Sequence, residues 1–333
     1  MKATIDDVAR RCGIEPAVVR RVLGARLRDV DEETRRRVED AADELGVPFP
    51  LPTRSLGIVY SEESGRGLTH PFFALILNAF KFEAEAHDYD VAFISSLEGS
   101  GAESTIERCR RLNVDGVCLV CVDFDAPRIR DLVASDIPCV TIDHMYKGVA
   151  AVLSDNETGV QKLVAYAISK GHRRIAFVHG QNNSIVTRTR LNQFYNSMAF
   201  NRIELPEGYV REGLYNDIAA AREIVHELLN RPDRPTCILL PEDLSYLGAQ
   251  EAARQMGLRI PEDISFAGYD GIPLTQALTP RLTTIRQSCD SIGRVAAQRL
   301  IDLINNPRTA SRMPSVFPVE LIEGGTIGPC AAQ

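Results

Sequence analysis

The sequence predicts an all-α head followed by an α/β core of two lobes. Three observations lead to this fold class. Residues 1–46 carry only helical patterns, residues 47–55 hold three prolines, and from residue 56 short apolar strands alternate with amphipathic helices. Such alternation is typical of parallel sheets with crossover helices. With 333 residues, the chain is too long for one ordinary core, so two lobes are favoured over one.

The head pattern consists of two short helices and a longer third one. Each helix has residues that favour its start or its end: Thr4 with Asp7, Gly13, Pro16, Asp31 and Gly46. Glu15 is a poor N-cap for the second helix, which runs to about Leu23. Two short helices on a tight turn plus a third have the outline of a helix-turn-helix module, so residues 1–46 are the predicted DNA-binding domain.

The core pattern predicts strands that end in polar residues. The candidate strands are LGIVY (56–60), DVAFIS (90–95), GVCLVC (116–121), PCVTI (138–142), RIAFVH (174–179), TCILL (236–240) and ISFAGY (264–269). The candidate helices lie between them, at 72–87, 157–170, 217–230, 244–256 and 289–305. Ligands of such sheets bind beyond the carboxyl ends of the strands, so polar residues there are candidates for a ligand site.

Composition and charge exclude several classes of protein. Hydrophobic residues make up 44% and charged residues 25%, which excludes disorder and collagen. No apolar run reaches the ~18 residues of a membrane span, and MKATIDDVARRCG has charges where a secretory signal would be apolar. We therefore expect a cytoplasmic protein. The net charge of −7 does not suggest general affinity for nucleic acid, although a small DNA-reading module can lie within an acidic chain.

The sequence contains few residues in patterns typical of a metal site or of an enzyme active site. Cys118 and Cys121 form a CxxC, but in a strand positions three apart point to opposite faces, so we expect buried, reduced thiols. No GxSxG, GxxxxGK[ST], GxGxxG or HExxH is present, and the six histidines have no local metal spacing. We expect no enzyme, no catalytic residue, no cofactor and no metal.

A series of motifs runs along nearly the whole chain. The head carries TIDDVARRCGIEPAVVRRVLG and DEETRRRVEDAADELG, and the core carries HPFFALILNAF (70–80), SDNETGV (154–160), GHRRIAFVHG (171–180), RLNQF (190–194), LGAQEAARQMGLRIPEDISFAGYDG (247–271) and LTPRLTTIRQ (278–287). In this order and spacing they resemble the LacI/GalR family of transcriptional regulators. The resemblance implies a ligand-responsive, sequence-specific DNA-binding regulator, more often a repressor than an activator.

The resemblance also implies an architecture. The core 56–325 would be two Rossmann-like lobes like those of periplasmic sugar-binding proteins, with the effector in the cleft between them. The N-lobe would take 56–153 and 283–312, and the C-lobe 154–282 and 313–325. The protein would be a homodimer, because one module contacts too little DNA for tight specific binding, and two modules would read a palindromic operator.

For the head, the resemblance implies that the start of the second helix enters the major groove. Arg21 stands at the family's base-reading arginine and fits guanine O6 and N7, unless it is a solvated surface arginine. Pro16 and Ala17 offer only apolar contact. The expected DNA-contacting residues are Thr4, Pro16, Ala17, Val18, Arg20, Arg21 and Arg26.

Two departures from the family concern DNA binding. Glu15, Val18 and Arg20 replace the usual Ser or Thr, whose hydroxyls contact phosphate. The linker is shorter than usual, and Pro48, Pro50 and Pro52 would break any hinge helix, so the family's minor-groove leucine wedge is not carried over. A short, proline-stiffened tether could restrict the orientation of the heads instead.

For the cleft, the resemblance implies six effector-binding residues: Phe72, Phe73, Asp143, Arg190, Glu242 and Asp270. Phe72 and Phe73 could also form an ordinary buried helix start, and Arg190 could pair with Asp270 across the cleft. Glu242 replaces a family asparagine, and three acids favour a donor-rich ligand such as a sugar, a polyol or an amine. A second interpretation stays open, in which the chain is a cytosolic small-molecule-binding protein with weak or unusual DNA binding.

Overall fold

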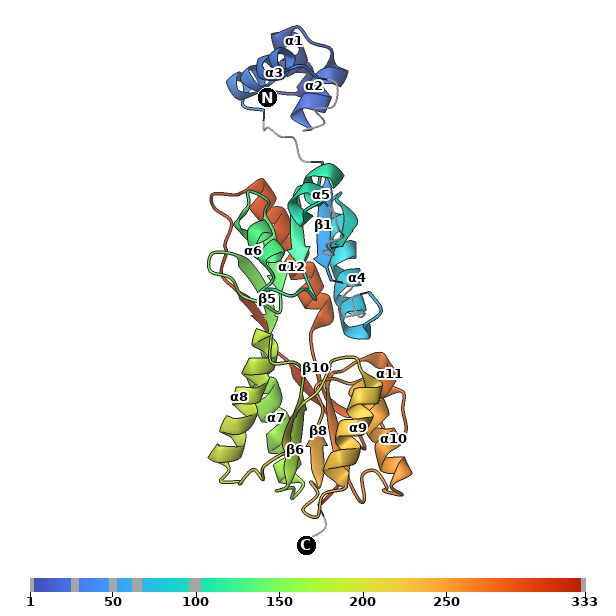
Figure 1. Cartoon of the computed structure of the whole chain (residues 1–333). Coiled ribbons are helices and arrows are strands. Elements are labelled where there is room, and N and C mark those ends of the chain that lie inside the picture. The colour runs from blue at the N-terminus through green and yellow to red at the C-terminus, as the bar shows by residue number, and fades with distance from the viewer. Residues whose placement is uncertain (1–2, 25–29, 48–52, 62–67, 96–102, 331–333) are drawn as a thin grey trace.

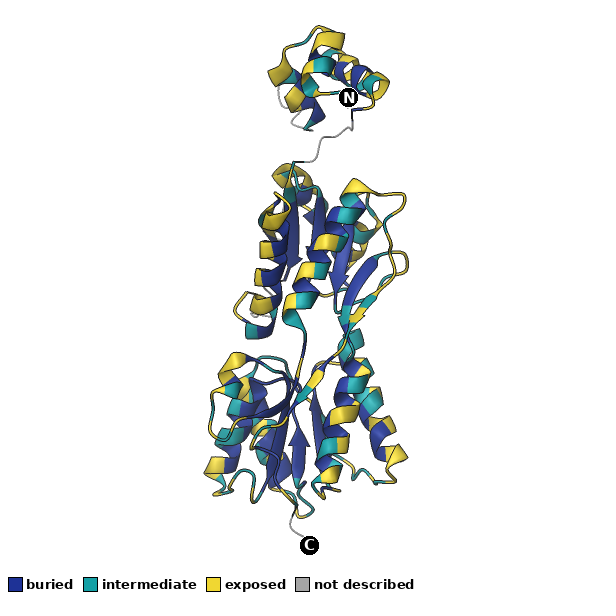
Figure 2. Cartoon of the chain, turned by 180° about the vertical axis from the view of Figure 1, so that it is seen from behind, coloured by how far each residue is buried: buried dark blue, intermediate teal, exposed yellow. Residues whose placement is uncertain are grey.

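A computed structural model gives the structure of the chain, and it describes residues 3–24, 30–47, 53–61, 68–95 and 103–330. A small helical head and two larger lobes follow one another along the long axis of the molecule (Figure 1). Each lobe is built on a sheet covered on both faces by helices, and buried residues line the strands and the helix faces that pack on them (Figure 2). All strand pairs are parallel except β10 with β12, which is antiparallel. Among the described residues no helix is long and apolar enough to cross a membrane.

The head consists of three helices, α1 (Ile5–Cys12), α2 (Pro16–Leu23) and α3 (Glu32–Leu45). The local signals in the sequence act as predicted. Thr4 and Asp7 form a capping box, Gly13 and Gly46 end their helices in the left-handed region, and Glu15 makes no side-chain cap. Apolar side chains from all three helices, among them Val8, Val19 and Val38, are fully buried in one small core.

The N-lobe sheet has the strand order β11-β5-β4-β3-β1-β2. Its strands are β1 (Ser55–Tyr60), β2 (Asp90–Ser95), β3 (Gly116–Leu119), β4 (Cys139–Ile142), β5 (Ala150–Ser154) and β11 (Ser315–Phe317). Its helices are α4 (Pro71–Ala86), α5 (Thr105–Leu112), α6 (Pro127–Ala134) and α12 (Cys289–Asn305). α4 and α12 cover one face and α5 and α6 the other. Gly293 lets α12 lie against α4, because an added Cβ would come within 2.2 Å of a backbone oxygen of α4.

The C-lobe sheet has the strand order β12-β10-β9-β8-β6-β7. Its strands are β6 (Ile175–His179), β7 (Val210–Glu212), β8 (Cys237–Leu239), β9 (Ser265–Asp270), β10 (Thr283–Arg286) and β12 (Glu320–Ile322). Its helices are α7 (Asn156–Ser169), α8 (Ile185–Phe200), α9 (Ile218–Leu229), α10 (Ser245–Gln255) and the short α11 (Pro273–Gln276). α7 and α8 cover one face and α9 and α10 the other.

The chain crosses between the lobes at places that differ from the expected boundaries. β10 was expected in the N-lobe, but Thr283–Arg286 pairs with β9 of the C-lobe sheet. β11 was expected in the C-lobe, but Ser315–Phe317 pairs with β5 of the N-lobe sheet. Each of these strands completes its own sheet before the chain crosses, so the boundaries near 283 and 313 were wrong.

One predicted strand is shorter than expected. β3 ends at Leu119, and Cys121 lies beyond it with a φ of 51°, so the argument from opposite strand faces was wrong for this pair. Neither cysteine forms a disulfide among the described residues, and burial raises the pKa of Cys118 well above its usual value. A buried thiol that resists ionisation is a poor metal ligand and a poor nucleophile.

The start of the core is fixed by one side chain. Asp115 accepts hydrogen bonds from the backbone N–H groups of Thr53 (2.7 Å) and Arg54 (2.8 Å), just before β1. The three linker prolines, Pro48, Pro50 and Pro52, lie outside the described residues. The tether between head and core therefore remains a prediction from the sequence.

Candidate functional site

The head presents one exposed face of α2. Pro16, Ala17, Arg20 and Arg21 are exposed, and their spacing places them on one side of the helix. Val19, Val22 and Leu23 on the other side are buried in the head core. The fold thus holds this face outward without using it for packing.

Three further residues expected to contact DNA have different surroundings. Val18 is half-buried and packs against the head core. Thr4 is exposed, and its hydroxyl already serves the capping box with Asp7. Arg26 lies outside the described residues.

Two aspartates follow the carboxyl ends of strands with unusual backbone geometry. Asp143 follows β4 with a φ of 61°, and Asp270 ends β9 with a φ of 116°. A non-glycine residue in this region is strained, and such strain is concentrated at functional sites. Both residues were predicted to line the cleft, one from each lobe.

The two carboxyl groups lie in a poorly solvated environment. Burial raises the pKa of Asp143 to about 6 and that of Asp270 well above its usual value, while the charge of Arg190 acts in the opposite direction. Asp270 Oδ1 accepts a hydrogen bond from Gln287 Nε2 at 2.7 Å. Among the described residues, none hydrogen-bonds to the buried Oδ1 of Asp143. The cleft therefore contains acidic acceptors that the protein itself satisfies only in part.

Arg190 is buried and held by its own lobe. Its Nε donates to Asn156 Oδ1 at 2.7 Å, its Nη1 donates to the Pro241 carbonyl at 3.1 Å, and its guanidinium lies 3.5 Å from the centre of the Tyr269 ring. Asn156 is the first residue of α7, and Asp155 is the N-cap of that helix. The support that Asn156 gives to Arg190 was missed, because the two residues meet only in the folded lobe.

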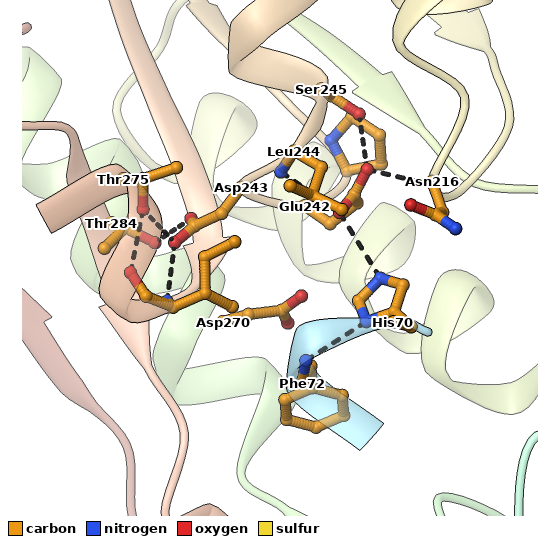
Figure 3. A network of polar contacts seen from close by, with 12 residues as sticks. His70, Phe72, Asn216, Glu242, Asp243, Leu244, Ser245, Asp270, Thr275 and Thr284 are labelled. Atoms are coloured by element: carbon orange, nitrogen blue, oxygen red, sulfur yellow. Dashed lines mark hydrogen bonds and ion pairs between the residues drawn. The ribbon is translucent and has the colours of Figure 1, made fainter. Parts of the chain in front are cut away.

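Glu242 is surrounded by donors (Figure 3). Its Oε1 accepts from the Asn216 backbone N–H at 2.9 Å and from Ser245 Oγ at 3.0 Å. Its Oε2 accepts from the Leu244 backbone N–H at 3.1 Å and lies 3.4 Å from His70 Nε2 of the N-lobe. Burial acts to raise the pKa of Glu242, but His70 first, and then the hydrogen bonds from Asn216 and Ser245, outweigh burial and hold the pKa below its usual value.

The neighbouring Asp243 has a structural environment. Its carboxylate accepts from the Ile272 backbone N–H at 2.9 Å and from the hydroxyls of Thr275 and Thr284 at 2.8 and 2.5 Å. Burial raises the pKa of Asp243 to about 7 despite these contacts. Asp243 thereby ties the start of α11 to β10 on the C-lobe side of the cleft.

His70 was missed as a cleft residue. It is the N-cap of α4, is 4% exposed, and brings an N-lobe side chain to Glu242. Ligand atoms of His70, Glu242 and Asp270 all lie within 4.8 Å of one another, a spacing that a metal ion could bridge. The sequence signal was the histidine directly before Pro71 at a helix start, but its partner lies in the other lobe.

The aromatic residues divide between the core and the cleft side. Phe72 is 4% exposed and belongs to the N-lobe core, whereas Phe73 is half-buried, and their ring centres are 5.1 Å apart. The apolar cluster around Phe72 also includes Leu244 and Ile272 of the C-lobe. The expectation of a buried helix start thus fits Phe72 better than Phe73. The shared cluster also shows that the two lobes are in apolar contact at this point.

An unpredicted aromatic stack follows β3 and β4. The rings of Phe124 and His144 are parallel with centres 4.2 Å apart, and Tyr146 packs against His144 at 4.5 Å. Burial lowers the pKa of His144. The negative charge of Asp125 acts to raise this pKa, and the positive charge of Arg188 on α8 acts to lower it. The charge of Arg188 in the C-lobe thus acts on a ring stack of the N-lobe.

The fold and these side chains define a class of protein, one in which two α/β lobes meet at buried polar side chains and are preceded by a three-helix head with an exposed, arginine-bearing face. Residues 164–327 match the family described as "Periplasmic binding protein-like domain". The HTH-type transcriptional repressor PurR of Escherichia coli O139:H28 (strain E24377A / ETEC) is 31% identical over 96% of this chain and 96% of its own length. The chain therefore belongs to the LacI/GalR family of ligand-responsive, DNA-binding transcriptional regulators, as its motifs predicted.

Solved structures agree with this assignment. A complex of the transcriptional regulator CelR with cellobiose has a TM-score of 0.73 and 25% identity, and the match covers 97% of this chain and 99% of that one. A LacI-family regulatory protein from Chloroflexus aggregans has a TM-score of 0.71 and 26% identity over 83% of this chain and 99% of its own. The lac repressor dimer bound to operator and the anti-inducer ONPF shares the fold, with a TM-score of 0.72 and 24% identity over 98% of this chain and 100% of its own. The interpretation as a DNA-binding regulator is favoured over that of a binding protein with weak DNA binding.

Proposed function

We propose that this protein is a homodimeric repressor that reads a palindromic operator through α2 and binds a small, hydroxyl-rich effector between its lobes. The exposed face of α2, held outward by a core that packs only the opposite face, is the observation that carries the proposal. A regulator of chromosomal genes works where the DNA is, so we place it in the cytoplasm.

DNA reading depends on arginine in this proposal. The exposed Arg21 donates through its planar fork to guanine O6 and N7, and the neighbouring Arg20 contacts phosphate. Pro16 and Ala17 pack against a thymine methyl. Thr4 and Val18 border the DNA backbone, and Arg26, which lies outside the described residues, is the seventh expected contact.

The effector is recognised by those polar groups of the cleft whose hydrogen-bonding capacity the protein does not use up. Asp143 from the N-lobe and Asp270 from the C-lobe offer acceptors to hydroxyl groups, and Arg190 offers its three remaining N–H donors. Phe73, half-buried beside Phe72, provides an apolar surface for a sugar ring. CelR, a relative by fold and sequence, holds cellobiose.

A second copy of the chain is the proposed partner of an apolar surface on the N-lobe. Leu75 and Phe82 on α4 are 41% and 54% exposed, and Phe93 on the neighbouring edge strand β2 is 47% exposed. Clustered exposed apolar side chains of this size mark an interaction site. Two copies joined here would also supply the two heads that a palindrome requires.

Selection of genomic DNA fragments by the purified protein tests the proposed function. We expect a palindrome to be enriched by the wild type and lost with Arg21→Ala, with affinity reduced by about 1–3 kcal/mol per half-site. Arg36→Ala, another exposed arginine of the head, serves as the matched control and should keep the wild-type enrichment. No enrichment even at low salt would show that the head does not read DNA.

A further inference from the structure

The carboxylate of Glu242 is fully occupied by donors of the protein itself. A carboxylate has about four acceptor positions, and here four donors occupy them: Asn216, Ser245, Leu244 and His70. Nothing is left for a ligand. Three of the donors belong to the C-lobe, but His70 belongs to the N-lobe, so the fourth position is filled only when the lobes are closed.

The hydrogen bond that His70 accepts fixes its protonation state. Its Nδ1 accepts from the Phe72 backbone N–H at 3.2 Å, as the N-cap of α4. Nδ1 therefore carries no proton, and the proton must be on Nε2, which faces Glu242. The imidazole is thus a neutral group that receives one hydrogen bond from its helix and donates another to the opposite lobe.

The position of the proton on His70 argues against a metal site at this place. A metal bound at Nε2 needs the lone pair there and the proton on Nδ1. A protonated Nδ1 would face the Phe72 N–H, donor against donor, and α4 would lose its cap. The spacing of His70, Glu242 and Asp270 would suit an ion, but the hydrogen bonds do not.

We propose that His70 and Glu242 form a latch that holds the two lobes closed before any effector binds, and that Glu242 serves closure rather than effector recognition. The latch works together with the apolar contact that Leu244 and Ile272 make with the N-lobe core beside Phe72. The inference rests on the proposed function only in taking the cleft as the effector site. An effector then binds to a cleft that is already partly closed, and it does not need to contact Glu242.

Hydrogen–deuterium exchange of the full-length protein, without DNA or effector, tests the latch. The variant His70→Asn keeps a residue that caps helices well but is too short to reach Glu242. We expect amides of β9 and of the segment 240–247 to exchange about tenfold faster or more, as loss of a hydrogen bond to a charged group implies. His87→Asn at the other end of α4 is the matched control and should exchange like the wild type.

A double-mutant cycle and a metal titration complete the test. Glu242→Gln should speed exchange in the same segments, and adding it to His70→Asn should give much less than the product of the two single effects. Wild-type exchange in His70→Asn, or fully multiplicative effects, would overturn the latch. Protection by zinc or manganese that His70→Asn abolishes would overturn it in favour of a metal site. None of these outcomes depends on operator binding, so a failed latch and a failed DNA reader remain distinguishable.

Discussion

The head and the cleft place their functional side chains in opposite environments. Arg21 of the head is exposed and contributes nothing to the packing of its module, whereas Arg190 of the cleft is buried and bound to Asn156, Pro241 and Tyr269. An exposed arginine can change without cost to the fold, because water already solvates it. A buried arginine is part of the fold and of the ligand site together, so function and stability cannot be separated there.

Removal of Arg190 should give the largest effect and separates the two regions most clearly. Arg190→Ala removes two buried hydrogen bonds and leaves Asp143 and Asp270 without the positive charge that opposes their raised pKa values. We expect the free energy of unfolding of the core to fall by about 3 kcal/mol or more.

Urea denaturation of the wild type and the variant measures this loss. Arg188→Ala, an exposed arginine of the same helix α8, is the matched control and should change the free energy by no more than about 0.5 kcal/mol. Equal stability of the two variants would contradict a structural role for Arg190.

The raised pKa values of the cleft acids predict an unusual pH dependence. Burial raises the pKa of Asp143 to about 6, so the folded protein binds this proton more tightly than the unfolded chain does. Ionisation of Asp143 in the folded protein costs free energy. This cost is absent below the pKa of the unfolded chain near 3.8, grows as the pH rises, and is complete above about pH 6. We expect Asp143→Asn to gain stability relative to the wild type between pH 4.5 and 7.5, by about 2–3 kcal/mol at the upper end.

Unfolding curves of both proteins across that range measure the difference. The stability difference between Asp143→Asn and the wild type should rise with pH and level off near 7, because the asparagine cannot ionise. The exposed Asp136→Asn is the control and should show no such rise. A difference that falls with pH would mean that the Asp143 carboxylate is stabilised by the fold.

Sequence signals that act locally were sufficient for the head. Thr4, Gly13, Asp31 and Gly46 each set a helix end through neighbours a few residues away, and each does so in the structure. The strand ends that carry Asp143 and Asp270 were also predictable, because a buried apolar run followed by an acid marks the carboxyl edge of a parallel sheet.

Contacts between distant segments could not be predicted in the same way. The short β11 is only half-buried or exposed and gave no apolar run, so its pairing with β5 depends on the whole sheet. His70 and Glu242 are separated by more than half the chain and meet only where the two lobes contact each other. The resemblance placed Glu242 among the effector-binding residues, and only the donors around it show that its acceptor positions are occupied.

The smallest expected effect distinguishes two neighbouring arginines on the exposed face of α2. If Arg20 contacts phosphate and Arg21 reads a base, Arg20→Ala should weaken binding to all DNA sequences alike, by about 1 kcal/mol or less, and reduce the slope of log K against log salt by about one per head. Arg21→Ala should instead flatten the preference at one base pair of each half-site. Titrations of operator and scrambled DNA at several salt concentrations measure both quantities. A loss of base preference in Arg20→Ala would exchange the two roles, while unfolding of either variant should match the wild type, since both side chains are exposed and outside the head core.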